Sequence, residues 1–438
     1  MYNITEKRGA DMKTMSKSEG EMLKEKILCI DNNLDALIWR LRVIEAAKKE
    51  LVFVTFDTED DLSGRALMAA LLHAAERGVK IRILIDGISG RLHQKKNDCF
   101  MVLANAENVE VRFYNPLTMK NRKAASYRMH DKYLIADNYL YILGGRNSND
   151  LFLGNFRDKY NVDRDILVYE REQEGTSLCQ LRDYFERIWS LPTNGIFTRT
   201  MKEEVWERGE EKLRKHYQLL QKKYPEAFWQ INWMQETMEV ESMQLLSNPV
   251  EARHKEPKLW DGLSRFMNKG QRIFINTPYF ICDERMYEEL SWLCRNGKQV
   301  QMMTNGVENG ANLAGCVDYL NERPRILKMG MEVYEYHGGQ SVHRKTVLID
   351  NDISIVGSFN FDMRSTYHDT ELMLVIRSKE LNRQLREVVA KDMEVSNHIM
   401  PDGTQKQGER YQKARISRRR KATYHLLRPV LKPIRHYL

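Results

Sequence analysis

The 438-residue chain contains one pattern twice, and this repeat limits the possible fold more than any other feature. The first copy is MHDKYLIADNYLYILGGRN at 129–147, and the second is VHRKTVLIDNDISIVGSFN at 342–360. Each copy has the spacing H-x-K-x4-D and then a glycine-containing turn that ends in asparagine. The two histidines are 213 residues apart. Because two such copies are very unlikely to arise by chance, we predict that the chain is an internal duplication.

The repeated polar residues are of types that suit phosphodiester chemistry. They are His130, Lys132, Asp137 and Asn147 in the first copy, and His343, Lys345, Asp350, Ser358 and Asn360 in the second. On an extended strand, residues two apart share a face, so each copy presents an imidazole beside an ammonium group. If the two copies face each other, the cations neutralise the phosphoryl oxygens, one imidazole attacks phosphorus and the other protonates the leaving oxygen.

Helix and strand patterns alternate in the same order in both halves, which predicts an α/β fold with sheets covered on both sides. In the first half we expect helices at 32–50 and 64–77 and strands at 51–56, 79–86 and 109–114. In the second half we expect helices at 259–269 and 283–295 and strands at 272–277, 299–304 and 331–336. A glycine follows the second helix of each half, as a helix C-cap often does.

We divide the chain into five segments. They are a polar N-terminal extension (1–30), a first half (31–200), a helical connecting segment (201–257), a second half (258–400) and a basic tail (401–438). The N-terminus lacks the apolar region of a signal peptide, and no stretch approaches the ~18 apolar residues of a transmembrane helix. The six cysteines are scattered without a C-x-x-C pair, which predicts reduced thiols in a cytoplasmic protein and neither disulfides nor a zinc site.

The repeated pattern resembles the signature of the phospholipase D superfamily, H-x-K-x4-D-x6-G-[GS]-x-N in duplicate, and both copies match it in full. Three flanking stretches resemble the bacterial cardiolipin synthase branch: FDMRS at 361–365, HDTEL at 368–372 and TPYF at 277–280. The resemblance covers roughly residues 35–400. The best-known members of that branch carry two N-terminal transmembrane helices, and this sequence departs from them there. The resemblance implies two pseudo-symmetric α-β-α sandwich halves that share one active site.

The resemblance also implies roles for individual residues. An acidic residue beyond each motif is expected to orient a histidine: Glu371 in the second half, and Asp165 in the first half, with Asp163 as the second choice. Asp137 and Asp350 belong to the motif and are expected to be structural, buried and hydrogen-bonded. By family analogy His130 is the nucleophile and His343 the acid and base, an assignment that the residues alone leave open. No metal or other cofactor is expected.

The tail differs in charge from the rest of the chain. From Arg410 to Leu438 there are ten Lys or Arg and no Asp or Glu, so the remaining residues carry −2 of the total net charge of +8. Apolar residues alternate with these cations, which is typical of a segment that lies on an anionic membrane surface. A nucleic-acid-binding tail and a disordered tail are the alternatives. Pro429 and Pro433 are expected to prevent one continuous helix, and removal of 410–438 is expected to release the protein from anionic liposomes.

These features together predict a cardiolipin synthase-type phosphatidyltransferase that acts on phosphatidylglycerol or another phospholipid, held peripherally at the inner face of the cell membrane. Hydrolytic phospholipase D and phosphatidylserine synthase share the same motifs and are the alternatives. A phospholipase D-type nuclease is disfavoured because the catalytic body lacks the basic excess of a phosphate-tracking groove, and two complete motifs argue against a non-catalytic lipid-binding module. The acceptor, whether phosphatidylglycerol, phosphatidylethanolamine, serine or water, stays open, as does the oligomeric state.

Overall fold

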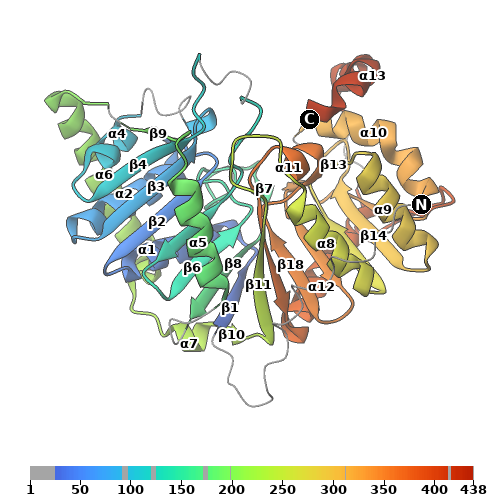
Figure 1. Ribbon diagram of the computed structural model, residues 1–438, viewed down its shortest axis with the longest axis horizontal. Coiled ribbons are helices and arrows are strands. Elements are labelled where there is room, and N and C mark those ends of the chain that lie inside the picture. The colour runs from blue at the N-terminus through green and yellow to red at the C-terminus, as the bar shows by residue number, and fades with distance from the viewer. Residues whose placement is uncertain are drawn as a thin grey trace, which may run out of the picture.

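Two nine-stranded sheets stand side by side in the computed structural model (Figure 1). The structure describes residues 25–90, 97–119, 125–170, 176–197, 199–310, 312–412 and 416–437. Most strands of the first sheet come from the first half of the chain and most strands of the second sheet from the second half, as the duplicated sequence predicts. The order of strands across one sheet repeats in the other, from the centre of the molecule outward.

The first sheet has the order β10-β1-β8-β6-β5-β2-β3-β4-β9. Its strands are β1 (Glu25–Ile30), β2 (Glu50–Thr55), β3 (Lys80–Asp86), β4 (Val109–Tyr114), β5 (Tyr133–Ala136), β6 (Leu140–Gly144), β8 (Asp165–Glu170), β9 (Gly195–Ile196) and β10 (Met238–Glu239). Strands β2, β3 and β4 are parallel, and the others pair antiparallel. The outer face packs against α1 (Asn33–Ala46), α2 (Leu62–Glu76), α4 (Asp98–Asn105) and α6 (Glu203–Lys223).

The second sheet has the order β11-β20-β18-β17-β12-β14-β15-β21-β22. Its strands are β11 (Ser242–Ser247), β12 (Arg272–Asn276), β14 (Gln299–Asn305), β15 (Glu332–Tyr336), β17 (Thr346–Ile349), β18 (Ile353–Gly357), β20 (Leu372–Arg377), β21 (Ser396–Ile399) and β22 (Gln405–Gln407). Helices α8 (Lys258–Lys269), α9 (Glu284–Arg295) and α10 (Leu313–Lys328) cover its outer face. Strand β11 lies within 201–257, the segment that the sequence predicted to be a helical connection, and it pairs with β20.

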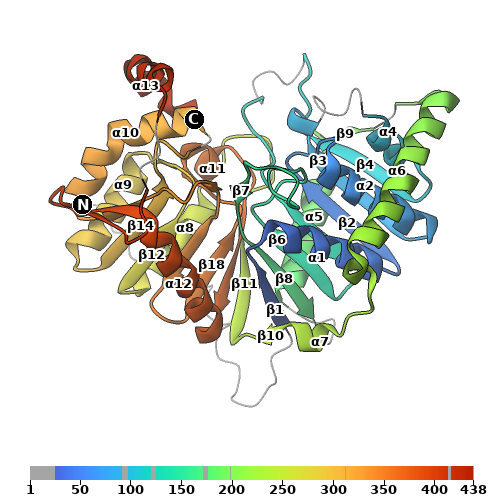
Figure 2. The ribbon, with the colours of Figure 1, turned by 180° about the vertical axis from the view of Figure 1, so that it is seen from behind.

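A central hydrophobic core joins the halves. It includes side chains from both sheets, such as Ile135 and Leu348, together with residues of α5 (Thr176–Trp189) and α12 (Lys379–Glu394). The inner faces of the two sheets share one core. Helices cover the outer faces, as both views show (Figures 1 and 2). The relative position of the two halves is therefore fixed by packing as well as by polar contacts.

The tail forms a helix, α13 (Arg418–Leu431), followed by the 3₁₀ helix η3 (Lys432–Tyr437). The expectation that Pro429 would interrupt the helix is corrected, since Pro429 lies inside α13. The α-helix ends two residues later, at Leu431, and the chain changes to 3₁₀ geometry just before Pro433. None of the helices in the described part of the chain combines the length and apolar character needed to span a bilayer.

Candidate active site

Both motif histidines lie in extended segments just before the motif strands. His130 and Lys132 precede β5, and His343 and Lys345 precede β17. Because β5 runs antiparallel to β2, and β17 antiparallel to β12, the start of β5 or β17 lies beside the C-terminal end of β2 or β12. Each histidine therefore lies at the edge of its sheet where the parallel strands have their C-terminal ends. The aromatic Phe56, directly after β2, meets the His130 ring edge-on with 5.4 Å between ring centroids.

Each of these segments pairs with a segment of the other half. Met129 forms a parallel bridge with Thr370, and the His130 backbone N–H donates to the Thr370 carbonyl at 3.2 Å. In the symmetric place, β16 (Ser341–Val342) pairs in parallel with β7 (Asn161–Val162). His130 therefore lies beside the residue that follows Thr370, and His343 lies beside the residue that follows Val162, each in the opposite half.

Those following residues are acids, and each forms a hydrogen bond with a histidine of the other half. The distance between His130 Nδ1 and Glu371 Oε1 is 2.9 Å, and the distance between His343 Nδ1 and Asp163 Oδ2 is 2.6 Å. A partner at Nδ1 fixes the ring orientation and leaves Nε2 available for chemistry. Sequence reasoning found the two carboxylates as candidates but did not find that each serves the histidine of the opposite half.

The first choice of Asp165 for the first half is corrected by the structure. Asp165 Oδ2 instead accepts from Arg40 at 2.8 Å and from Arg146 at 3.0 Å, and it is fully buried. The strand register gives the reason, because Gly144 pairs with Asp165 and its counterpart Gly357 pairs with Met373. The residue two positions before Asp165 is therefore the equivalent of Glu371, and that residue is Asp163. The register of β8 and β20 against the motif glycines is the signal that could have identified it.

The two lysines are buried beside the histidines. Lys345 Nζ is 3.2 Å from Asp163 Oδ2, and Lys132 Nζ donates to the His130 carbonyl at 2.5 Å. Their relative exposures are only 1% and 2%, so neither cation is well hydrated. A desolvated ammonium gains much more from an arriving phosphate than a surface lysine does.

The turn residues of the two motifs complete the site. Asn360 Nδ2 donates to the Tyr279 hydroxyl at 3.1 Å, and Ser358 Oγ donates to Glu371. At the place of Ser358 the first half has Gly145, where a Cβ would lie 2.5 Å from the Asp163 carboxylate oxygens. In the described part of the chain, the Oδ1 atoms of Asn147 and Asn360 are buried and have no hydrogen-bond partner.

Three aromatic residues at the site were given no role from the sequence. Phe152 meets the His343 ring edge-on with 5.0 Å between centroids, as Phe56 meets His130. Tyr279, the partner of Asn360, lies in the TPYF stretch, which sequence reasoning used as a family signature without giving it a role. The positions of Phe56 and Phe152 relative to the motifs do not identify them as site residues in the sequence. Only folding brings them next to the histidines.

Burial keeps both imidazoles neutral. Desolvation and the neighbouring Lys345 lower the pKa of His343 to about 4, and desolvation with Lys132 lowers the pKa of His130 well below its usual value. Burial also raises the pKa of Glu371 to about 8, with Lys132 opposing the shift. For Asp163 burial acts in the same direction, but the Lys345 ammonium and the His343 imidazole hold its pKa below its usual range. The two structurally equivalent acids are therefore electrostatically different.

The motif aspartates lie away from the histidines. Asp137 accepts backbone N–H bonds from Lys48, Lys49 and Glu50 at 2.8–2.9 Å, and Asp350 accepts from Gln271 and Arg272 at 2.9 Å. A strand separates each aspartate from its motif lysine, about 16 Å at the rise of an extended chain. Both occupy left-handed turns, with φ of 49° and 47°. Asp137 is buried as expected, whereas Asp350 is only half-buried. Both are hydrogen-bonded to backbone and lie away from the other polar residues of their motifs.

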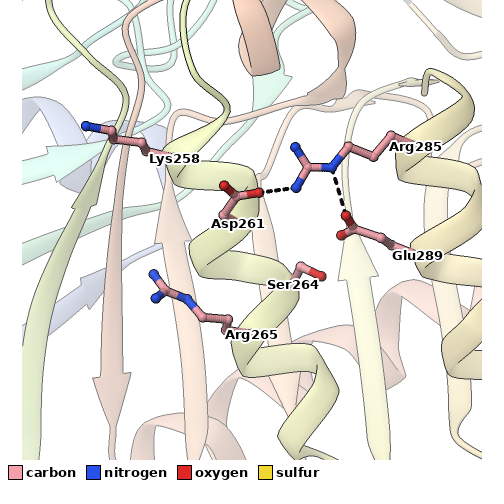
Figure 3. A pocket seen from close by; sticks show the side chains of 6 residues that line it. All are labelled: Lys258, Asp261, Ser264, Arg265, Arg285 and Glu289. Carbon is pink, nitrogen blue, oxygen red and sulfur yellow. Dashed lines mark hydrogen bonds and ion pairs between the residues drawn. The ribbon is translucent and has the colours of Figure 1, made fainter. Parts of the chain in front are cut away.

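A hollow of about 500 Å³ on the outer side of the second half does not belong to this site. Its lining residues are Lys258, Asp261, Ser264, Arg265, Arg285 and Glu289, from α8 and α9. Arg285 Nε contacts Glu289 at 3.0 Å, and its Nη2 contacts Asp261 (Figure 3). Arg285 is therefore already paired with Asp261 and Glu289 within the protein.

The fold and the duplicated site define a protein of the phospholipase D superfamily, with the α-β-α halves that the sequence predicted. The chain belongs to the family described as cardiolipin synthase, PLD-like domain, whose model matches residues 41–189 and 263–393. Cardiolipin synthase C of Escherichia coli is 26% identical over 392 residues, which cover 80% of this chain and 81% of that protein. A Helicobacter pylori protein without an assigned function is 26% identical over 431 residues, covering 87% and 82%.

The fold is also that of phosphatidylserine synthase from Haemophilus influenzae Rd KW20. That crystal structure superposes with a TM-score of 0.64 over 94% of this chain and 95% of the other, at 16% sequence identity. Its likeness supports the two-half architecture. The family match, and not this likeness, puts the chain among the enzymes of this superfamily.

The two first-half acids can be separated by substitution. We expect Asp163→Asn to lower kcat for phospholipid turnover by up to about 10⁴-fold, because the His343 ring loses its orienting carboxylate. We expect Asp165→Asn to reduce the free energy of unfolding by about 3–5 kcal/mol, because Arg40 and Arg146 keep buried charges without a carboxylate. Steady-state kinetics and thermal unfolding of both variants check this. Equal losses of kcat in two equally stable variants would contradict the assignment.

Substitution of a motif aspartate is expected to lower stability rather than catalysis. Asp137→Ala removes the acceptor of three backbone N–H groups, so we expect a loss of about 1–3 kcal/mol in the free energy of unfolding. The kcat measured at a temperature where the variant stays folded should remain within a few-fold of wild type, since the catalytic groups are about 16 Å away. Urea unfolding and kinetics on the same preparation test both parts. A large fall in kcat without loss of stability would give Asp137 a chemical role.

Proposed function

We propose that this protein is a cardiolipin synthase-type phosphatidyltransferase that uses a phosphohistidine intermediate. The observation that supports the proposal best is the pair of imidazole–carboxylate contacts, each made between the two halves, with a buried lysine beside each histidine. Two histidines at one site allow one to carry the phosphatidyl group while the other moves a proton. The named relatives of the chain are consistent with a phospholipid substrate.

In the first step, Nε2 of one histidine forms a bond to the phosphorus of phosphatidylglycerol. The bond between phosphorus and the glycerol oxygen breaks, and the other histidine gives its proton to that oxygen, so free glycerol leaves. Lys132 and Lys345 stabilise the negative charge on the phosphoryl oxygens, and the Asn147 and Asn360 amides supply further hydrogen bonds. Their unpaired Oδ1 atoms also offer acceptors for hydroxyl groups of the lipid headgroup.

In the second step, the histidine that gave its proton takes one back. A hydroxyl of a second phosphatidylglycerol loses its proton to this histidine and bonds to phosphorus, and the phosphorus–nitrogen bond breaks. The product is cardiolipin, and both imidazoles return to their starting state. The same geometry would produce phosphatidic acid with water as acceptor or phosphatidylserine with serine as acceptor, which are the competing functions.

We assign His130 as the nucleophile and His343 as the acid and base. The family resemblance suggests this order, and the electrostatics of the two pairs support it. Asp163 has a lowered pKa and remains ionised, so it stabilises the imidazolium form that an acid and base must visit. Glu371, with a pKa of about 8, offers less negative charge to His130. A nucleophile needs the neutral imidazole, which burial favours.

We place the enzyme at the inner face of the cell membrane as a peripheral protein. The substrate is a bilayer lipid, and the basic tail has the charge to attract an anionic leaflet. A nuclease is a weaker candidate, because the chain outside the tail has no basic excess.

The decisive experiment compares purified wild type with His130→Ala on vesicles of phosphatidylglycerol and phosphatidylethanolamine. We expect cardiolipin, and a phosphatidyl adduct on the peptide that contains His130, from wild type only, with both products read by mass spectrometry. Release of glycerol or of ethanolamine identifies the lipid that donates the phosphatidyl group. The control is His216→Ala, since the His216 ring contacts the Leu62 carbonyl on the outer helices and neither motif. Phosphatidic acid as the sole product would make the protein a hydrolase, and no lipid turnover would overturn the proposal.

The lowered histidine pKa values predict an unusual pH profile. The alkaline limb of kcat/KM reports the acid of the free enzyme. With the pKa of His343 at about 4, its protonated fraction already falls with rising pH below 6.5, so kcat/KM should be higher at pH about 5.5 than at pH about 7.5. Asp163→Asn should move the limb to still lower pH, because the carboxylate favours the imidazolium. Detergent-dispersed substrate avoids the acidic layer at a vesicle surface, and an alkaline break above pH about 7 would contradict this prediction.

A further inference from the structure

The basic tail is fixed to the second half. Tyr424 of α13 is buried, and its hydroxyl donates to the Val307 carbonyl at 2.6 Å. Arg428 Nε donates to Asn321 Oδ1 at 2.8 Å, and Arg435 makes two contacts of 3.0 Å with Asp318, both on α10. With Leu431 packed in the same small core, α13 is a docked helix.

The outer face of α13 has a different composition. Leu426 is 72% exposed and Val430 is 55% exposed, four residues apart and therefore on one side of the helix. Arg418, Arg419 and Lys421 are also exposed, in the first turn of the helix. The inner face of α13 makes the contacts with α10. The apolar residues of the outer face are therefore available to a partner outside this chain.

This outer face lies on the side of the molecule where the active site is found. The loops that follow parallel strands β2, β4 and β14 lie at the edge of the sheets that carries the two histidines. Phe56 follows β2, Leu117 and Met119 follow β4, and Val307, which holds Tyr424, follows β14. Leu117 is 52% exposed and Met119 is 84% exposed. Figures 1 and 2 show α13 on the same upper side as β7 and α11 (Met363–Tyr367), which adjoin the site.

We propose that this edge is a bilayer-docking face, defined by Leu117, Met119, Leu426, Val430 and the cations of the first turn of α13. The apolar side chains enter the interfacial region of an anionic bilayer while the cations meet lipid phosphates. This inference rests on the proposed function in one respect, namely that the enzyme takes its substrate from a bilayer. The docked helix sets the orientation of the enzyme, so that the histidines face the lipid headgroups.

Charge identifies the partner as an anionic lipid surface. The segment from Arg410 to Leu438 has ten cations and no acid, and its exposed positions add large apolar side chains. Nucleic acid would use the cations but would leave Leu426 and Val430 without a partner. An anionic bilayer uses both kinds of residue, since apolar burial and charge attraction add together at its surface.

The test uses the full chain and vesicles of phosphatidylglycerol and phosphatidylcholine. We expect Leu426→Glu to weaken vesicle binding by about tenfold or more, because it removes an inserted apolar group and adds a repelled charge. The matched control is Leu219→Glu on α6, since Leu219 is similarly exposed, at 60%, but on a helix of the outer side of the first half. Flotation gives the binding constant, and thermal unfolding verifies that both variants are folded. These point variants replace truncation of the tail, which would expose the core under α13.

A second measurement separates this inference from the proposed function. On short-chain phosphatidylglycerol dispersed in detergent, Leu426→Glu should keep the wild-type kcat, while on vesicles its rate should fall with its binding. Equal vesicle binding by Leu426→Glu and Leu219→Glu, or loss of activity on dispersed lipid, would overturn the docking face. Wild type that binds vesicles in the expected way but turns over no lipid would overturn the proposed function and leave the docking face standing. Binding to DNA that Leu426→Glu leaves unchanged, without vesicle binding, would replace the bilayer with nucleic acid.

Discussion

The two imidazole–carboxylate contacts of the active site depend on two short parallel pairings between the halves, Met129 with Thr370 and β16 with β7. Each pairing fixes the backbone of one histidine beside the acid of the opposite half. The carboxylate that contacts each motif histidine comes from the opposite half, so a single half could not orient its own motif histidine in this way. The shared core under α5 and α12, and the contact of Arg164 with Thr346 across the boundary, hold this arrangement in place. The duplication thus provides two equivalent parts, and the chemistry depends on how they are joined.

Buried charge gives the site its reactivity. Lys132 and Lys345 are almost fully removed from water, and desolvation lowers the pKa of both, to about 7 for Lys132. An arriving phosphodiester supplies the negative charge that these lysines lack, so the site is electrostatically more favourable with substrate than without it. The same desolvation keeps the imidazoles neutral and ready to attack phosphorus. The unequal acids, an ionised Asp163 and a Glu371 with a raised pKa, then allow two similar histidines to act differently.

Local sequence patterns determined most of the fold. The expected strand 109–114 coincides with β4, and the expected strands at 79–86 and 272–277 differ from β3 and β12 by one residue. Hydrophobic periodicity, glycine caps and charge act over a few neighbouring residues. The sequence is therefore sufficient to predict these elements. The sequence was insufficient at Pro429, which lies inside α13 although proline disfavours the helix interior. The strand character of 242–247 was also missed, since β11 forms only by pairing with β20.

The sequence by itself determined which side chains carry the chemistry: two histidines, two lysines and their asparagines, at a spacing that appears twice. Tertiary structure alone decided that Asp163 is the partner of His343, that Asp165 neutralises Arg40 and Arg146, and that the pairs cross between the halves. The physical reason is that a hydrogen bond between residues 180 or 241 positions apart is set by strand register and packing, which no local pattern encodes. In the same way, the sequence determined that the tail is basic and partly apolar, and the contacts of α13 with α10 decided which of its residues remain exposed.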